Sequence, residues 1–150
     1  MIQAFTILRK KYLWSAELYL AGAKESDIRD ALRERQIRVE EADWQKIHLL
    51  GDLGPEKLTD YYNLCDVFCM PSYFEAYGLV FAEALTYGLP CIGRDKFAMS
   101  EFIEDGCTGR LISGEDAEEL ALDLWEVLQD PKYREEVERL KTLMNGKESL

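Results

Sequence analysis

Short apolar segments alternate with helix-like segments along most of this chain of 150 residues, and this alternation is the feature that most constrains its fold. Residues 17–22 form an apolar segment ending in glycine, and residues 26–35 follow with Ile28, Ala31 and Leu32 at helical spacing. Strands that are joined by helices pair in parallel and bury both faces of their sheet. The sequence therefore predicts one α/β domain over residues 1–150, with a doubly wound, Rossmann-like, mostly parallel sheet.

The same strand–helix unit recurs further along the chain. Residues 46–50 form a second predicted strand, and Pro55 opens a helix, a position that proline favours. The apolar run at 67–70 stops at Pro71, and Gly88 is placed to end the helix that follows. The other predicted elements are a helix at 1–11, strands at 90–93 and 110–112, an amphipathic helix at 117–128, and a solvated closing helix from residue 131.

Composition limits the possible partners. Hydrophobic residues make up 47% of the chain, enough for a core, and the formal net charge is -11. Binding along a nucleic-acid backbone requires a basic face, which this sequence lacks, so we expect no nucleic-acid partner. A single nucleotide remains compatible with an acidic protein, because the N–H groups at a helix N-terminus can hold its phosphates.

The cysteines and the single histidine do not have the spacing of a metal site. Cys65, Cys69, Cys91 and Cys107 form no Cys-x-x-Cys pair, and His48 lies apart from them between apolar neighbours. We therefore expect reduced thiols, a cytoplasmic location, no bound metal and a histidine packed in the core. No segment approaches the ~20 consecutive apolar residues of a membrane span.

Two carboxylates, Glu75 and Glu83, bracket Gly78 where a strongly apolar helix is predicted to begin. Because residues 79–85 are apolar on every side of that helix except at Glu83, we expect the helix and Glu83 to be buried. A buried carboxylate needs a partner from the protein or from a ligand. The loop 71–78 leaves the carboxyl end of a strand, where open α/β sheets bind ligands, so we expect the active site here.

Six motifs follow one another from this loop onward. They are Met70-Pro71-Ser72, Glu75-Ala76-Tyr77-Gly78-Leu79, Glu83-Ala84, Gly88-Leu89-Pro90, Glu101-Phe102-Ile103-Glu104-Asp105-Gly106 and Gly109-Arg110-Leu111-Ile112. Their order resembles that in the retaining glycosyltransferases of family 4. The resemblance runs from about Ile7 to about Leu128 and is to the C-terminal, nucleotide-sugar-binding domain of the two-domain GT-B fold.

The resemblance implies a role for each candidate site residue. Glu83 would accept hydrogen bonds from the ribose hydroxyls of the donor, and Glu75 would act as the catalytic residue that contacts the transferred hexose. The backbone N–H groups of Tyr77, Gly78 and Leu79 would bind the diphosphate. The donor would be a nucleotide-diphosphate sugar such as a UDP- or GDP-hexose, with no cofactor and no metal.

Simpler interpretations of the same residues remain open. Glu83 could instead pair with a buried arginine or lysine, and Glu75 could stabilise the start of the helix near Leu79 through the helix dipole. Gly78 could be a turn residue alone. Glu101 is more typical of the first turn of a short helix than of a ligand-binding residue, and we leave it outside the site.

The chain departs from the family pattern in two places. We expect it to lack the first strand of the family domain and the basic phosphate-binding loop after it, which would leave an apolar slot in the sheet for another segment or another copy of the chain. Where the family has a glycine pair, this chain has Phe97-Ala98-Met99-Ser100, and Arg94 or Lys96 could supply positive charge instead.

Three functions follow from these observations. The first is the donor-binding half of a retaining hexosyltransferase, inactive without the N-terminal acceptor-binding domain and located in the cytoplasm or peripherally at a membrane in the full-length enzyme. The second is a non-catalytic binding or regulatory module that pairs with another chain. The third is an unrelated doubly wound domain, such as a receiver, although the acidic cluster that a receiver needs is missing.

Overall fold

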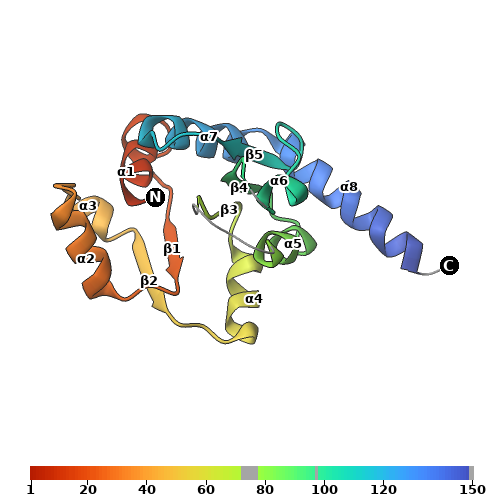
Figure 1. The fold of residues 1–150 in the computed structure, drawn as a ribbon, viewed down its shortest axis with the longest axis horizontal. Coiled ribbons are helices and arrows are strands. Elements are labelled where there is room, and N and C mark those ends of the chain that lie inside the picture. Colours follow the sequence, from red (N-terminus) through yellow and green to blue (C-terminus); the bar gives the residue numbers. More distant parts are fainter. Residues whose placement is uncertain (72–77, 97, 149–150) are drawn as a thin grey trace.

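The computed structural model describes residues 1–71, 78–96 and 98–148 (Figure 1). Its elements in chain order are α1 (Ile2–Lys11), β1 (Leu18–Ala21), α2 (Glu25–Glu34), α3 (Glu41–Trp44), β2 (Ile47–Gly51), α4 (Pro55–Leu64), β3 (Phe68–Cys69), α5 (Leu79–Thr86), β4 (Cys91–Arg94), α6 (Met99–Phe102), β5 (Gly109–Ile112), α7 (Ala117–Gln129) and α8 (Pro131–Glu148). The predicted strands and longer helices are confirmed to within one or two residues.

All described strand pairs are parallel, but the strands form two sheets (Figure 1). One sheet pairs β1 with β2, with Leu18 opposite Ile47, and the other has the order β3-β4-β5, with Cys91 between Phe68 and Gly109. The α/β fold is therefore confirmed. β1 and β3 are not hydrogen-bonded to each other, so the sheet is interrupted between them, in agreement with the predicted slot in a sheet that lacks the family's first strand.

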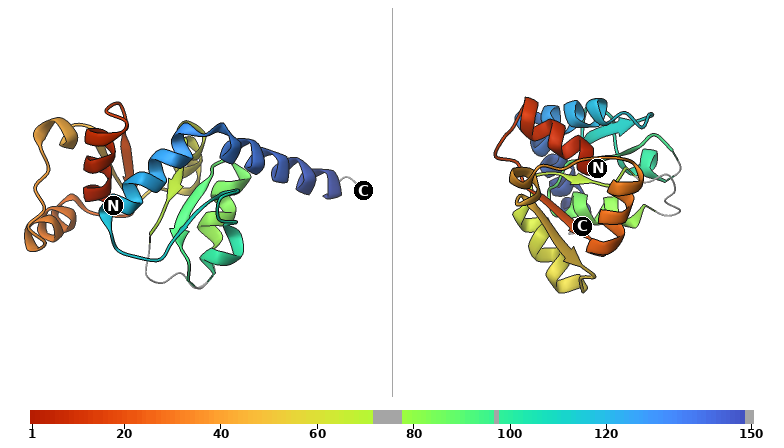
Figure 2. Two further views of the ribbon diagram at one scale, coloured as in Figure 1. Left: turned by 90° about the horizontal axis from the view of Figure 1, so that it is seen from above. Right: turned by 90° about the vertical axis from the view of Figure 1, so that its left-hand side faces the viewer.

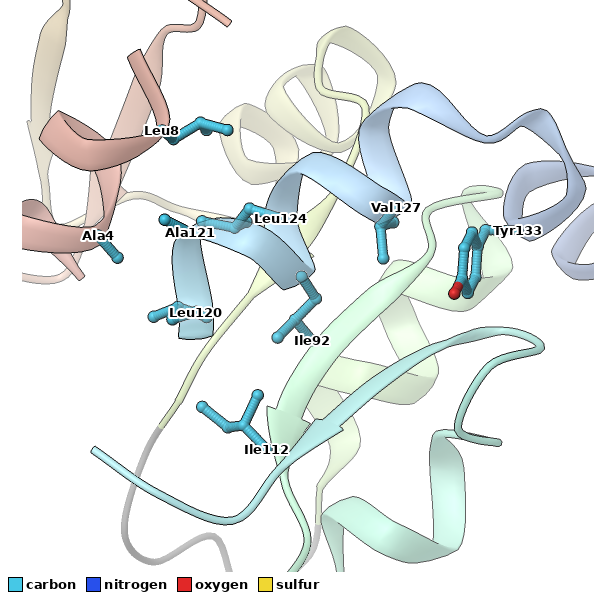
Figure 3. Packing of buried hydrophobic residues seen from close by; sticks show 9 residues of the cluster. All are labelled: Ala4, Leu8, Ile92, Ile112, Leu120, Ala121, Leu124, Val127 and Tyr133. Carbon is cyan, nitrogen blue, oxygen red and sulfur yellow. The ribbon is translucent and has the colours of Figure 1, made fainter. Parts of the chain in front are cut away.

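The sheet β3-β4-β5 is covered on both faces. On one face Ile92 and Ile112 pack against α7, through Leu120 and Leu124 among others, as Figure 3 shows. On the other face a second cluster contains residues of α4, α5, β4 and α6: Tyr62, Phe81, Ala84, Leu89, Cys91, Met99 and Ile103. Successive residues of a strand point to opposite faces, so β4 contributes to both cores and all four of its residues are buried.

Helix α1 connects this body to the smaller sheet. Ala4 and Leu8 join the cluster around α7, whereas Ile2 and Phe5 pack with Ile47 in the cluster beneath β1 and β2. Because these four residues of α1 face two different cores, the helix holds the two sheets in one structure. Figure 2 shows α1 and α7 lying side by side above the strands.

The C-terminal end of α5 follows its predicted pattern closely. Gly88 has φ +82°, its N–H donates to the Leu85 carbonyl at 3.0 Å, and the Leu89 N–H donates to the Ala84 carbonyl at 3.1 Å. These two bonds form a Schellman motif, in which glycine is favoured because of its left-handed backbone. The predicted termination of the helix at Gly88 is confirmed.

Helix α8 begins on the body and then extends away from it (Figures 1 and 2). Tyr133 and Val137 are buried, whereas Leu143 and Met144 are 51% and 62% exposed. The prediction of a solvated helix therefore holds for its C-terminal part. Within the residues that the structure describes, none of the helices is long and apolar enough to cross a membrane.

His48 is not the packed core residue that the sequence predicted. Its imidazole is 37% exposed, its Nε2 lies 3.2 Å from Glu17 Oε1, and its ring stacks on Tyr19 with the centroids 4.5 Å apart. It lies on the face of β2 opposite the cluster that contains Ile47, which explains the exposure. In the part of the chain that the structure describes, no group of three or more potential metal ligands comes together.

Candidate functional site

The predicted active-site loop follows β3 and precedes α5 in the chain, and its described first residue, Pro71, is hydrogen-bonded to Arg94 at the end of β4. Two of the predicted site residues, Glu75 and Tyr77, lie outside the described residues. The other three, Gly78, Leu79 and Glu83, lie together at the N-terminal end of α5. The structure therefore brings the described site residues to the carboxyl ends of parallel strands, as the sequence predicted.

Gly78 is the N-cap of α5 and has a left-handed backbone, with φ +64° and ψ 18°. Its carbonyl oxygen accepts hydrogen bonds from the N–H groups of Phe81 at 3.0 Å and Ala82 at 3.3 Å. The N–H groups of Leu79 and Val80 precede the first helical carbonyl that could pair with them. They carry the positive end of the helix dipole, so this end of α5 favours an anion.

Phe102 of α6 packs directly over Gly78. A β-carbon on Gly78 would lie 2.8 Å from both Cδ2 and Cε2 of the phenyl ring and 3.3 Å from the β-carbon of Ala98. Glycine is therefore required twice, by the left-handed backbone and by the close approach of Phe102. The sequence pointed to Gly78, but the phenylalanine that covers it carries no local signal and was missed.

Glu83 is half-buried, which corrects the prediction of a buried carboxylate. Helix α5 turns Phe81 and Ala84 into the core, and Glu83 lies on its flank. Within the described residues no lysine or arginine forms an ion pair with Glu83, so the alternative of a neutralising cation has no support there. Burial, and secondarily the negative charge of Glu83, raises the pKa of Tyr62 on α4 to about 12.

Leu79 also departs from the expected burial. Its side chain is 67% exposed, although the helix that it begins is apolar on nearly every side. Helix α5 contacts β4, α6 and α8. The burial predicted for the whole helix is therefore wrong at its first turn, which is the part that a ligand at the sheet edge would meet.

Arg94, the last residue of β4, connects two of the loops at this edge. It is 7% exposed, its Nε donates to the Pro71 carbonyl at 3.1 Å, and its Nη1 donates to the Gly114 carbonyl at 2.6 Å. Pro71 follows β3 and Gly114 follows β5. The sequence suggested that Arg94 or Lys96 supplies charge to the cleft; the structure shows that Arg94 holds loop backbones in place, while Lys96 is exposed.

The segment that stands where the family has a glycine pair includes Ala98, and the backbone conformation there suits alanine. Ala98 has φ -65° and ψ -18°, an ordinary right-handed conformation, and is buried beside Gly78. Phe97 lies outside the described residues. An alanine therefore fits at position 98 without strain, and the departure from the family pattern does not disturb the backbone there.

Taken together, the described site offers one anion-favouring helix N-terminus and one carboxylate a turn beyond it. The N–H groups of Leu79 and Val80 can donate to a phosphate, and Glu83 can accept from two neighbouring hydroxyls. A phosphate and a diol are the groups that a nucleotide presents.

Comparison with known proteins identifies the family and the fold. A sequence model of the family described as "Glycosyl transferases group 1" matches residues 1–142. The D-inositol 3-phosphate glycosyltransferase of Nocardia farcinica is 34% identical over 86 residues, which are 57% of this chain and 19% of that protein. An uncharacterised 41.2 kDa protein in the cps region of Klebsiella pneumoniae is 37% identical over 78 residues, 52% of this chain and 22% of that protein. The chain thus spans about a fifth of the length of these curated relatives.

Solved structures show the same fold. The pneumococcal O-GlcNAc transferase GtfA, in complex with UDP and GlcNAc, superposes with a TM-score of 0.74 at 23% identity over 94% of this chain and 28% of that chain. WaaG, a glycosyltransferase involved in lipopolysaccharide biosynthesis, superposes with a TM-score of 0.73 at 23% identity over 94% of this chain and 37% of that chain. The α/β architecture described above is therefore that of part of a GT-B fold.

Proposed function

The chain belongs to the glycosyl transferases group 1 family, and we propose that it is the nucleotide-sugar-binding part of a family 4 retaining glycosyltransferase, equivalent to its C-terminal domain. One observation carries this proposal: the N-terminus of α5 and the carboxylate of Glu83, which has no ion-pair partner among the described residues, lie together at the carboxyl edge of the sheet. The first favours a phosphate and the second accepts from a diol. A nucleoside diphosphate presents both groups.

The roles of the individual residues follow from this arrangement. Glu83 accepts hydrogen bonds from the two ribose hydroxyls, and the backbone N–H groups of Tyr77, Gly78 and Leu79 donate to the diphosphate. Glu75 contacts the hexose that is transferred and stabilises the positive charge that develops at its reacting carbon. A helix N-terminus supplies the electrostatic compensation, so the site needs no metal and no cofactor.

The proposal also assigns the chain its place in the reaction. It binds a UDP- or GDP-hexose in the cytoplasm, and an acceptor-binding domain on a longer polypeptide completes the cleft in which transfer occurs. Residues 1–150 alone therefore bind the donor weakly and do not transfer the sugar.

Titration calorimetry with UDP, GDP and their glucose conjugates tests donor binding. We expect Glu83→Gln to weaken nucleotide binding by roughly tenfold or more, because a charged acceptor of two hydrogen bonds becomes a neutral one. Glu75→Gln should leave UDP or GDP binding unchanged and reduce transfer in the enzyme-length protein. Glu34→Gln, the same substitution at an exposed acid on α2, is the matched control.

Failure to bind any of these compounds, together with full activity of an enzyme-length protein substituted at Glu75 and Glu83, would refute the proposal. A second candidate is a non-catalytic module that completes its sheet with another polypeptide. The interruption of the sheet between β1 and β3 favours it. Size-exclusion chromatography with and without such a polypeptide separates it from the first candidate.

A further inference from the structure

One tryptophan projects into solvent from the turn that joins α1 to β1. The Trp14 side chain is 77% exposed, more than any other large hydrophobic side chain that the structure describes. A single exposed leucine is ordinary on a protein surface, but tryptophan is enriched among the residues that contribute most to binding at interfaces. Trp14 therefore marks a candidate interaction surface.

The backbone holds this tryptophan in a fixed turn. The Ala16 N–H donates to the Leu13 carbonyl at 3.1 Å, which closes the turn. The guanidinium of Arg9 donates to the carbonyls of Trp14 and Ala16. It is itself fixed by an ion pair with Asp43 at 2.8 Å, and the Arg9 side chain is only 10% exposed. Because the backbone is already ordered, little conformational entropy would be lost when Trp14 binds a partner.

A cavity of about 450 Å³ opens beside this turn. Leu13, the residue before Trp14, lines it together with Pro90 and with Val127 and Leu128 of α7. Its described lining includes no residue of β1 or β3, so it is distinct from the gap between the two sheets. Pockets of about 300–1,000 Å³ hold small ring systems, and an indole ring is one.

Acidic side chains surround the apolar floor of the cavity. Asp66, Asp130 and Glu135 line it against a single base, Arg134, which pairs with Asp66 at 3.4 Å. The segment that carries Trp14 is basic instead, with Lys10 exposed in the last turn of α1. Neither Lys10 nor Glu135 forms an ion pair with another described residue. The projecting segment and the cavity are therefore complementary in charge, and both are apolar at the centre.

The two complementary features lie side by side on one chain, because Leu13 belongs to the cavity and Trp14 follows it. A surface of this kind can pair with itself across a twofold axis, which brings each tryptophan to the cavity of the other copy. The acidic rim argues against a nucleotide as occupant. The formal net charge of -11 argues against the anionic surface of a membrane.

We propose that this chain associates as a symmetric dimer in which Trp14 of each copy inserts into the cavity beside Leu13 of the other copy. Lys10 of each copy pairs with Glu135 of the other at the rim. The cavity lies at the amino ends of the strands, since Pro90 immediately precedes β4. The proposed donor site lies at the opposite edge, so it stays open in the dimer, and the inference does not rest on the proposed function.

Sedimentation equilibrium of the complete chain over a range of concentrations measures the Kd of the dimer. Trp14→Ala should raise this Kd at least roughly hundredfold, because a central tryptophan is lost twice in each dimer. Leu143→Ala, at an apolar side chain that is 51% exposed on the far part of α8, is the matched control and should change Kd less than about twofold. Circular dichroism checks that each variant keeps its secondary structure.

Two charge reversals test which groups meet at the rim. Lys10→Glu and Glu135→Lys should each raise the Kd of the dimer roughly tenfold, because like charges then meet at both rims. An equimolar mixture of the two variants should form a heterodimer with a Kd near that of the wild-type chain, since opposite charges meet again. Recovery on mixing is expected only if the two residues belong to different copies.

Each result decides the proposal. A chain that remains monomeric up to about 1 mM would overturn it. A dimer that keeps its Kd after Trp14→Ala would overturn it in favour of association through the edges of the interrupted sheet. Assemblies larger than a dimer, or no recovery in the mixture, would overturn the symmetric arrangement. If Trp14→Ala fails to fold, the two charge variants decide, because they leave the turn intact. No nucleotide enters these measurements, so their failure leaves the donor proposal untouched.

Discussion

Gly78→Ala perturbs the candidate site at its most constrained backbone position. A non-glycine residue in the left-handed region, here at φ +64°, costs about 1–2 kcal/mol. The new β-carbon would also lie 2.8 Å from two ring carbons of Phe102, so the ring has to move, at a further cost of about 1–3 kcal/mol for overpacking. We expect a total loss of about 2–5 kcal/mol in the free energy of unfolding.

Gly106 provides a control that separates the two costs. It has φ +76°, and a β-carbon there would meet no atom within 4 Å. Gly106→Ala should therefore cost about 1–2 kcal/mol, the backbone cost alone. Urea denaturation followed by circular dichroism measures both variants, and unchanged m-values would show that the denatured state is not altered.

A double-mutant cycle then tests the contact itself. In a chain that carries Phe102→Ala, Gly78→Ala should cost no more than Gly106→Ala, because the ring is gone and the backbone cost remains. Equal costs of the two glycine substitutions in the wild-type chain would refute the close approach of Phe102. A cost below about 0.5 kcal/mol at both positions would refute the left-handed conformation as the source of the loss.

Two further predictions concern a buried acid and a buried base. Burial raises the pKa of Asp123 to about 6, an effect that Arg110 partly opposes. As the pH rises from about 4 to about 6 this buried carboxyl loses its proton, and the folded chain should lose up to about 3 kcal/mol of stability. Asp123→Asn should abolish that loss, as measured by urea denaturation at about pH 4 and at about pH 6. Arg94→Lys should cost about 1–3 kcal/mol by the same assay, because one ammonium group cannot donate to both Pro71 and Gly114 in the guanidinium geometry.

Matched variants control both measurements. Asp105 also lies near Arg110, at 3.6 Å, but its side chain is 49% exposed, so Asp105→Asn should keep the wild-type loss of stability with rising pH. The Arg134 side chain is 51% exposed, and Arg134→Lys should change stability by less than about 0.5 kcal/mol. Equal pH profiles for the two aspartate variants, or equal costs for the two arginine variants, would contradict the assigned roles.

The elements of the fold could be predicted because their signals are local. Pro55 at the first position of α4 and Gly88 after α5 act through backbone restrictions that need no knowledge of distant residues. The burial of Cys91 and Ile92 in β4 is similarly encoded in their apolar side chains. The family resemblance added an order of motifs, and with it Gly78 and Glu83, which the structure brings together at the sheet edge.

The errors arise where the answer depends on what lies across space. Whether Leu79 and Glu83 are buried depends on which neighbouring elements cover each side of α5, and periodicity does not contain that information. His48 alternates correctly with its neighbours, but its imidazole is 37% exposed and lies 3.2 Å from Glu17. Sequence pattern gives the direction of a side chain more readily than it gives the partner that meets it.

Arg94 shows why the candidate site is more than the α5 N-terminus. A nucleotide site at a sheet edge requires that loops from several strands keep a fixed spacing, and irregular loop backbone supplies few of its own hydrogen bonds. One buried guanidinium, donating to the backbone after β3 and to the backbone after β5, fixes that spacing from the end of β4. Loosening it would change the position of Pro71, where the predicted active-site loop begins. We therefore expect the stability of this edge and the geometry of the proposed donor site to be coupled through a residue that need not touch the donor.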